Sequence, residues 1–143
     1  MKTIALRFSN NFAPETGTIA EHQKIINDIG YVWYGKLGNA VSSTVKAQIL
    51  KNEEPKILLI HSGSTGRYWA YIDCIQREIP DLSAIPAYYR EMANKFHSWF
   101  RIIRFEDAPQ NILSQCTVAS SGKVLSQASR HSMSPYYIIE TNE

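Results

Sequence analysis

The sequence lacks the features that mark several broad classes of protein. No stretch approaches the roughly 18 consecutive apolar residues of a membrane-spanning helix, and residues 1–7 do not contain the apolar run of a signal peptide. Only two cysteines are present, Cys74 and Cys116, and their separation matches no metal-ligand spacing. These absences argue against a membrane protein or a disulfide-rich secreted one, and we expect a reduced, cytoplasmic protein with no membrane partner.

The motifs of common enzyme classes are also missing. The glycine-rich segment 61–67 lacks the P-loop pattern of nucleoside triphosphatases, and no Gly-x-Ser-x-Gly nucleophile motif occurs. The four histidines, at positions 22, 61, 97 and 131, are scattered and form no zinc motif. We therefore expect no cofactor and no bound metal, and we favour a binding protein over an enzyme.

The composition of the chain is that of a globular protein, with a high content of aromatic residues. Its 143 residues have the length of a single domain, which we place at residues 1–143. The formal net charge is +2, which is compatible with a nucleic-acid partner but does not by itself indicate one. Eight tyrosines and three tryptophans bring the aromatic content to 11%, so the positions of these rings carry most of the functional argument.

The hydrophobic patterns predict an α+β fold. Hairpins outnumber βαβ crossovers among the expected strands, which favours a small, curled, mixed β-barrel of about six strands with two or three helices. Thr18 and Glu21 have the spacing of a helix capping box, and Gly30 suits the end of that helix. The polar, serine-rich segment 117–134 is expected to be a long loop. The expected strands are 3–8, 31–34, 56–61, 67–76, 99–106 and 136–140, and the expected helices are 18–29, 43–52 and 85–96.

The segment Gly30–Lys36 places three aromatic rings between two glycines and ends on a lysine. Rings beside permissive backbone and a cation suit a flat ligand such as a nucleobase. Trp33 and Tyr34 are adjacent in an expected strand, so they point to opposite faces and only one of them can enter the main core. The other ring then lies in a second core, on the surface or in a pocket. Ordinary packing of both rings against helices is the alternative.

The expected strand 67–76 separates its side chains in the same way. One face is apolar, whereas the other carries two rings between Arg67 and Asp73. On that second face Trp69 offers a π-surface, Arg67 offers planar donors and Asp73 offers acceptors, as a groove that reads a base edge would require. The alternative is a surface salt bridge beside a half-buried tryptophan.

The order of these motifs resembles the PUA-like superfamily, and within it most closely the EVE and YTH branch. The resemblance covers nearly the whole chain and rests on element order and strand character. It implies a curled barrel with helices at its ends and a pocket that accepts a flipped-out, often modified base between aromatic rings. The segments that carry it are Ser9-Asn10, Gly30–Lys36, Ile-Leu-Leu-Ile-His-Ser-Gly at 57–63, Tyr-Trp-Ala-Tyr-Ile-Asp at 68–73, Trp-Phe-Arg-Ile-Ile at 99–103 and Tyr-Tyr-Ile-Ile-Glu at 136–140.

The resemblance and the strand patterns together predict a nucleic-acid-binding module that recognises a modified base of DNA or RNA. The expected base-binding residues are Ser9, Asn10, Trp33, Tyr34, Ser62, Ser64, Trp69 and Asp73. The expected phosphate-contacting residues are Lys36, Arg67, Lys123 and Arg130.

Two functions from other classes stay open at this point. The related ASCH branch includes amidohydrolases, and a small hydrolase acting on a modified nucleoside would draw first on Lys36, His61 and Glu106. The Lys/Thr/Glu set of that branch has no clear counterpart in this sequence. A protein-interaction domain would instead use the aromatic clusters as an exposed apolar patch. The sequence leaves open the oligomeric state and whether the partner is DNA, RNA or a free nucleotide.

Overall fold

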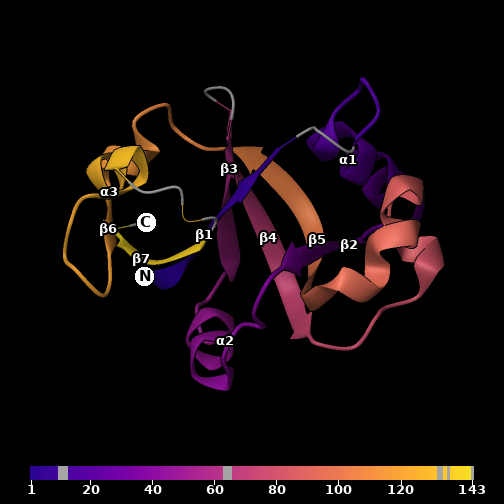
Figure 1. Ribbon diagram of the computed structural model, residues 1–143, viewed down its shortest axis with the longest axis horizontal. Coiled ribbons are helices and arrows are strands. Elements are labelled where there is room, and N and C mark those ends of the chain that lie inside the picture. The colour runs from indigo at the N-terminus through magenta and orange to yellow at the C-terminus, as the bar shows by residue number, and fades with distance from the viewer. Residues whose placement is uncertain (10–12, 63–65, 132–133, 135, 143) are drawn as a thin grey trace.

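The computed structural model describes residues 1–9, 13–62, 66–131, 134 and 136–142. Its centre is one sheet of seven strands, in which the N-terminal and C-terminal strands are neighbours (Figure 1). Met1 and Thr141 join these two strands through main-chain hydrogen bonds of 2.7 and 2.9 Å. The strands are β1 (Lys2–Phe8), β2 (Val32–Leu37), β3 (Lys56–His61), β4 (Arg67–Gln76), β5 (Phe96–Asp107), β6 (Cys116–Val118) and β7 (Tyr136–Thr141).

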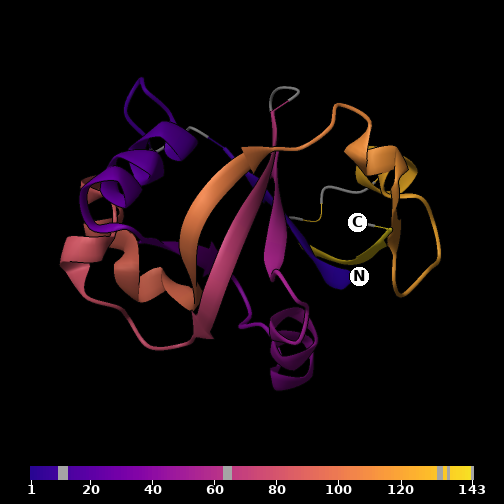
Figure 2. The same cartoon turned by 180° about the vertical axis from the view of Figure 1, so that it is seen from behind.

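Helical segments cover the sides and one end of the sheet. In Figure 1, α1 lies on one side of the strands, α3 on the other and α2 below them, and Figure 2 shows the same arrangement from behind. The helix expected over 85–96 is instead a series of 3₁₀ turns. Among the described residues, no helix has the length and apolar character needed to cross a membrane. The helices are α1 (Thr18–Ile29), α2 (Ser43–Leu50) and α3 (Leu125–His131), and the 3₁₀ segments are η1 (Leu82–Ala84), η2 (Ala87–Lys95) and η3 (Ile112–Ser114).

The sheet is mixed, as expected, but it is not closed into a barrel. Its strand order is β2-β5-β4-β3-β1-β7-β6, so β2 and β6 are edges, and the described residues form no ladder between them. Of the strand pairs in this sheet, β1 and β3 are parallel and the others are antiparallel. The sequence predicted six strands, and the additional one is the short strand β6. Curling nevertheless brings β2 close to β7, because Lys36 Nζ lies 4.7 Å from the centre of the Tyr136 ring.

Side-chain alternation sorts buried residues onto the two faces of the sheet. Within β4, Ala70 and Ile72 enter a first core, whereas Trp69 and Tyr71 enter a second core on the other face. The first core is closed by α2, and the second is covered by η3, β6 and α3. The predicted separation of the two faces is confirmed, but the second face of β4 is covered by protein and forms a core.

A third cluster lies beside β2 and β5. Trp33 and Trp99 pack there against Ile85 and Tyr89, which the 3₁₀ region contributes. Tyr34, the neighbour of Trp33, belongs to the first core. The two adjacent rings therefore point to opposite faces of β2, as strand alternation predicts.

Helix α1 ends as expected but begins differently. Gly30 adopts the left-handed conformation, with φ of 92°, and its N–H donates to the last turn of the helix, which is the ending that glycine favours. The expected capping box of Thr18 and Glu21 is not formed, because the N-cap residue is Gly17 and makes no side-chain bond. Thr18 Oγ1 donates instead to the Ser9 carbonyl oxygen at 3.1 Å, which fastens the start of α1 to the end of β1.

The segment 117–134 is not the long loop that we expected. It contains most of β6 and the whole of α3, and Leu125 of α3 is fully buried. Arg7 of β1 donates through Nη2 to the Ser129 carbonyl oxygen at 2.5 Å and thereby holds α3 against the sheet. Both elements are too short to give a periodic hydrophobic signal, and tertiary contacts of this kind stabilise them.

Candidate functional site

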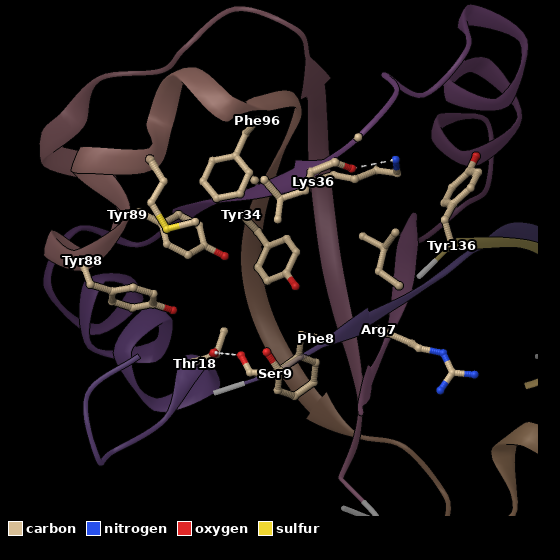
Figure 3. A pocket seen from close by; sticks show the side chains of 15 residues that line it. Arg7, Phe8, Ser9, Thr18, Tyr34, Lys36, Tyr88, Tyr89, Phe96 and Tyr136 are labelled. Atoms are coloured by element: carbon tan, nitrogen blue, oxygen red, sulfur yellow. Dashed lines mark hydrogen bonds between the residues drawn. The ribbon is translucent and has the colours of Figure 1, made fainter. Parts of the chain in front are cut away.

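A pocket opens where β1, β2, η2 and β7 approach one another (Figure 3). Its volume is about 450 Å³, which is within the usual range for small-ligand sites. Six of the lining side chains are aromatic, two are cationic, and none of those that the structure describes is acidic. The lining residues are Leu6, Arg7, Phe8, Ser9, Thr18, Tyr34, Gly35, Lys36, Leu37, Gly38, Tyr88, Tyr89, Met92, Phe96 and Tyr136.

Aromatic rings form both the floor and the ends of this pocket. Tyr34, Tyr89 and Phe96 are floor residues, and each is 5–6% exposed. Tyr88 and Tyr136 are only partly buried, and Figure 3 shows them at opposite ends of the pocket with Tyr34 between them. Because stacking requires an accessible ring face, Tyr88 and Tyr136 are the rings best placed to contact a planar ligand.

The floor rings are supported by a fully buried histidine. The His22 ring lies 4.9 Å from the Tyr89 ring and 5.3 Å from the Tyr34 ring, measured between centroids. Its Nδ1 donates to the Thr18 carbonyl oxygen at 2.8 Å, since a carbonyl can only accept. Burial lowers the pKa of His22 to about 4, so the ring is neutral near pH 7. Its Nε2 atom has no hydrogen-bond partner among the described residues.

Lys36 supplies the positive charge at the end of the pocket nearest to Tyr136. Its Nζ donates to the Asn39 carbonyl oxygen at 2.7 Å and lies 4.7 Å from the Tyr136 ring centre, a cation–π distance. Burial lowers the pKa of Lys36, as expected for an ammonium group withdrawn from water. The other cation, Arg7, points away from the rings in Figure 3 and donates to main-chain carbonyl groups. Lys36 is therefore the cation that a ligand in the pocket would meet.

Polar groups gather at the other end, beside the start of α1. Ser9 and Thr18 line the pocket there and are joined by their own hydrogen bond. Burial raises the pKa values of Tyr34, Tyr88 and Tyr89, so these hydroxyl groups stay protonated at neutral pH and can donate. The Tyr88 hydroxyl is buried beside the side chains of Thr18 and Tyr89, which act on its pKa, but it makes no hydrogen bond of good geometry within the described part of the chain. A polar ligand atom that paired with this hydroxyl group would offset the free-energy cost of burying it without a well-formed hydrogen bond.

Gly35 permits the close packing of β2 against the pocket wall. A Cβ atom at this position would lie 2.5 Å from Cγ of Phe96, well inside the contact distance of two carbon atoms. The missing side chain thus lets the Phe96 ring approach the strand. This glycine has a packing role, in contrast to Gly30, which has a conformational one.

Three of the residues predicted from the sequence line the pocket. They are Ser9, Tyr34 and Lys36, which come from the end of β1 and from β2. Asn10 and Ser64 lie outside the described residues. The aromatic segment of β2 therefore contributes one ring and one cation to the pocket, and it directs its tryptophan elsewhere.

The other predicted base-binding residues lie away from this pocket. Trp33 is 7% exposed in the third cluster, and Trp69 is 1% exposed in the second core. Ser62 is exposed next to the end of β3. Asp73 is exposed on β4 and accepts from Arg101 Nε at 2.7 Å. The structure does not bring these four side chains together.

The predicted phosphate contacts occupy three separate places. Lys36 lines the pocket, whereas Arg67 is partly buried at the start of β4. Lys123 and Arg130 line a second hollow between α2, β7 and α3. Of the four, only Lys36 lies in the aromatic pocket, and Lys123 and Arg130 share a surface of their own.

The candidate hydrolase residues are not brought together. Lys36 is in the pocket, but His61 packs edge-on against the Phe8 ring at a centroid distance of 5.1 Å. Glu106 accepts from the Tyr71 hydroxyl at 3.2 Å on the other side of the sheet. Neither His61 nor Glu106 lines the pocket, and within the described residues no group of three His, Cys, Asp or Glu side chains could hold a metal ion.

Sequence reasoning missed most of the aromatic lining. Tyr88 and Tyr89 fall in a segment that we considered only as a helix, and Tyr136 falls in the closing strand. The adjacent Tyr88 and Tyr89 repeat the paired-ring pattern of Trp33 and Tyr34, and this was the signal that would have identified the wall. His22 gave no signal, because its burial depends on tertiary packing against β2 and η2.

Comparison with known proteins gives one match. A family model described as Pua-like matches residues 4–141. The matched region includes every residue that lines the aromatic pocket. No curated protein and no solved structure matches the chain significantly.

Proposed function

This chain belongs to the Pua-like family, and from that membership and the pocket we propose that it binds nucleic acid by accepting a single base between Tyr88 and Tyr136. The observation that carries the proposal is the composition of the pocket. Partly exposed rings stand at both ends, a cation lies beside one of them, and no acidic side chain lines the wall among the described residues. These groups match a ligand that is flat, aromatic and linked to a phosphate.

Side chains at the polar end of the pocket form the hydrogen bonds to the edge of the base. Ser9, Thr18 and the buried hydroxyl of Tyr88 offer both donors and acceptors there. Lys36 at the opposite end meets the negative charge of the sugar–phosphate backbone. The base thus lies along the floor formed by Tyr34, with its edge toward α1 and its backbone toward β7.

A modified base is the preferred ligand in this proposal. A methyl group adds apolar surface, and the floor of Tyr34, Tyr89 and Phe96 offers a buried aromatic wall to receive it. The resemblance to the EVE and YTH branch supports the same assignment. The gain from one buried methyl group is about 0.8 kcal/mol, which corresponds to roughly a fourfold difference in affinity.

The proposal is tested by titration calorimetry at low salt with single-stranded DNA and RNA oligonucleotides, methylated and unmodified. Tryptophan fluorescence is a poor probe, because Trp33, Trp69 and Trp99 are buried outside the pocket. The informative variant is Tyr88→Ala, which removes a partly exposed ring. We expect it to weaken binding about tenfold or more, since a stacked base typically contributes about 1–3 kcal/mol.

Tyr31→Ala is the matched control. Tyr31 is also partly buried, but it packs in the third cluster and does not line the pocket. It should therefore leave the affinity unchanged. The proposal fails if no oligonucleotide binds the wild-type protein at low salt, or if the Tyr31 variant loses as much affinity as the Tyr88 variant.

A further inference from the structure

A second hollow borders the aromatic pocket and has a different chemistry. It lies between α2 and the β6–β7–α3 region, and its volume is about 1090 Å³. Figure 1 shows β7 between α2 and α3. Tyr136 lines both hollows, so one ring separates the two spaces. We call this second hollow the α2–α3 groove.

The α2–α3 groove carries positive charge and hydroxyl groups. Lys2, Lys123 and Arg130 are its charged residues, and no acidic side chain lines it among the residues that the structure describes. Lys2 is paired with Glu140 at 3.5 Å. Lys123 and Arg130 are exposed and make no ion pair with the described residues. The hydroxyl groups belong to Ser42, Thr44, Ser120, Ser121, Ser134, Tyr136 and Tyr137.

The fold fixes the backbone around Lys123 and Arg130, which have no ion pair among the described residues. Lys123 follows a tight turn in which Gly122 is left-handed, with φ of 72°, and the Val118 N–H donates to the Lys123 carbonyl oxygen at 2.8 Å. Arg130 stands on α3, which Arg7 fastens to the sheet through the Ser129 carbonyl. Arg7 also lines the aromatic pocket, so one side chain connects the wall of the pocket to the helix that bears Arg130.

We infer that the α2–α3 groove binds the sugar–phosphate backbone of a single strand whose base occupies the aromatic pocket. The nucleic-acid strand crosses Tyr136 and Lys36. Its phosphates on either side of the bound base form ion pairs with Lys123 and Arg130. Cations without an ion pair among the described residues, hydroxyl donors and the absence of described lining carboxylates match a polyanion. Tyr136 lines both hollows, so the two spaces are adjacent at this ring. This inference rests on the proposed function.

The test compares a mononucleotide with a single-stranded oligonucleotide of about ten nucleotides, a length within the usual site size of single-strand binders. Binding is measured by calorimetry over a range of salt concentrations. Lys123→Ala combined with Arg130→Ala is compared with the charge-matched pair Arg77→Ala and Lys95→Ala. Arg77 and Lys95 are exposed and line neither the pocket nor the groove. Thermal melting establishes that each variant is folded.

We expect the groove variant to weaken oligonucleotide binding roughly tenfold at low salt and to leave mononucleotide binding unchanged. The slope of log affinity against log salt should fall by about 1.4, since each contact with a single strand contributes about 0.7. The control pair should change neither quantity.

The inference is overturned if the wild-type protein binds the oligonucleotide no more tightly than the mononucleotide, or if the groove variant behaves like the control. Both outcomes are compatible with base binding in the aromatic pocket, so they overturn only the inference about the groove. If the wild-type protein binds neither the mononucleotide nor the oligonucleotide, the proposed function fails as well. Equal losses with a sulfated polysaccharide of similar charge would also overturn it, because the groove would then be a general polyanion surface.

Discussion

The ammonium group of Lys36 lies 4.7 Å from the centre of the Tyr136 ring, although four strands separate β2 from β7 in the sheet. This contact exists because the open sheet curls until the start of its last long strand meets the second strand. It closes one end of the aromatic pocket and marks the border with the α2–α3 groove. The proposed ligand would cross the molecule at this point.

Replacement of Tyr136 separates the role of its ring from that of its hydroxyl group. Tyr136→Phe keeps the ring face above Lys36 and should bind an oligonucleotide within a factor of about two of the wild-type affinity. Tyr136→Leu removes the π-surface and should weaken binding about tenfold. Titration calorimetry measures both. Equal affinities for the Phe and Leu variants would mean that the ring does not stack on a base.

Acid should destabilise the protein through His22. The pKa of His22 is about 4 in the folded protein, whereas an unburied histidine has a pKa of 6.5. As the pH falls below 6.5 the unfolded chain takes up the proton first, so the free energy of unfolding decreases until about pH 4. The loss amounts to about 3 kcal/mol. The neighbouring Tyr34 and Tyr89 do not titrate in this range, because burial raises their pKa values.

Urea unfolding of the wild-type protein and of His22→Phe across this pH range checks the prediction. Carboxyl groups titrate in both proteins, so the difference between them isolates the histidine. The variant should lose about 3 kcal/mol less than the wild type between pH 6.5 and 4. Parallel pH profiles would show that His22 does not carry the effect.

Gly35→Ala should cost more stability than Gly30→Ala, although both replace a glycine of the same aromatic segment. A Cβ atom at Gly35 would meet the Phe96 ring at 2.5 Å, whereas nothing lies within 4 Å of one at Gly30. Overpacking typically costs about 1–3 kcal/mol, and the left-handed backbone at Gly30 adds about 1 kcal/mol for alanine. Chemical denaturation gives both values. In a Phe96→Ala background the cost at Gly35 should largely disappear, and a fully additive double variant would contradict the packing account.

Trp69→Ala should unfold or strongly destabilise the protein. Its side chain is 1% exposed in the second core, and truncating a buried aromatic residue typically costs about 3–5 kcal/mol. Trp69→Phe retains most of the packing, should fold, and should bind an oligonucleotide with unchanged affinity. A folded Trp69→Phe protein with lost binding would show that the tryptophan contacts the ligand after all.

The strand pattern of the sequence predicted the sheet better than it predicted the pocket. Runs such as Lys56–His61 and Arg67–Gln76 carry enough β-branched and aromatic residues to define a strand with its bounds. The alternation of Trp33 and Tyr34 correctly separated two faces. Strand β6 and helix α3 escaped notice because their stability comes from contacts that are distant in sequence, such as that between Arg7 and Ser129.

The pocket depends more than the sheet does on contacts between residues that are distant in the sequence. Local reasoning reached Ser9, Tyr34 and Lys36, because they lie at a strand end and in a conspicuous aromatic segment. It also favoured Trp69, because a strand pattern reports which face a ring occupies but not whether another layer covers that face. The cover of β6, η3 and α3 over the second core decides that question.

Residue-resolved NMR with a single-stranded oligonucleotide is the sharpest test of base binding between Tyr88 and Tyr136. In a titration of ¹⁵N-labelled protein at low salt, we expect the largest shift changes on Ser9, Lys36, Tyr88 and Tyr136. Intermolecular NOEs should connect the protons of one base to the rings of Tyr88 and Tyr136. Saturable binding whose shift changes avoid the aromatic pocket, or the absence of any shift change, would show that the pocket does not hold a base.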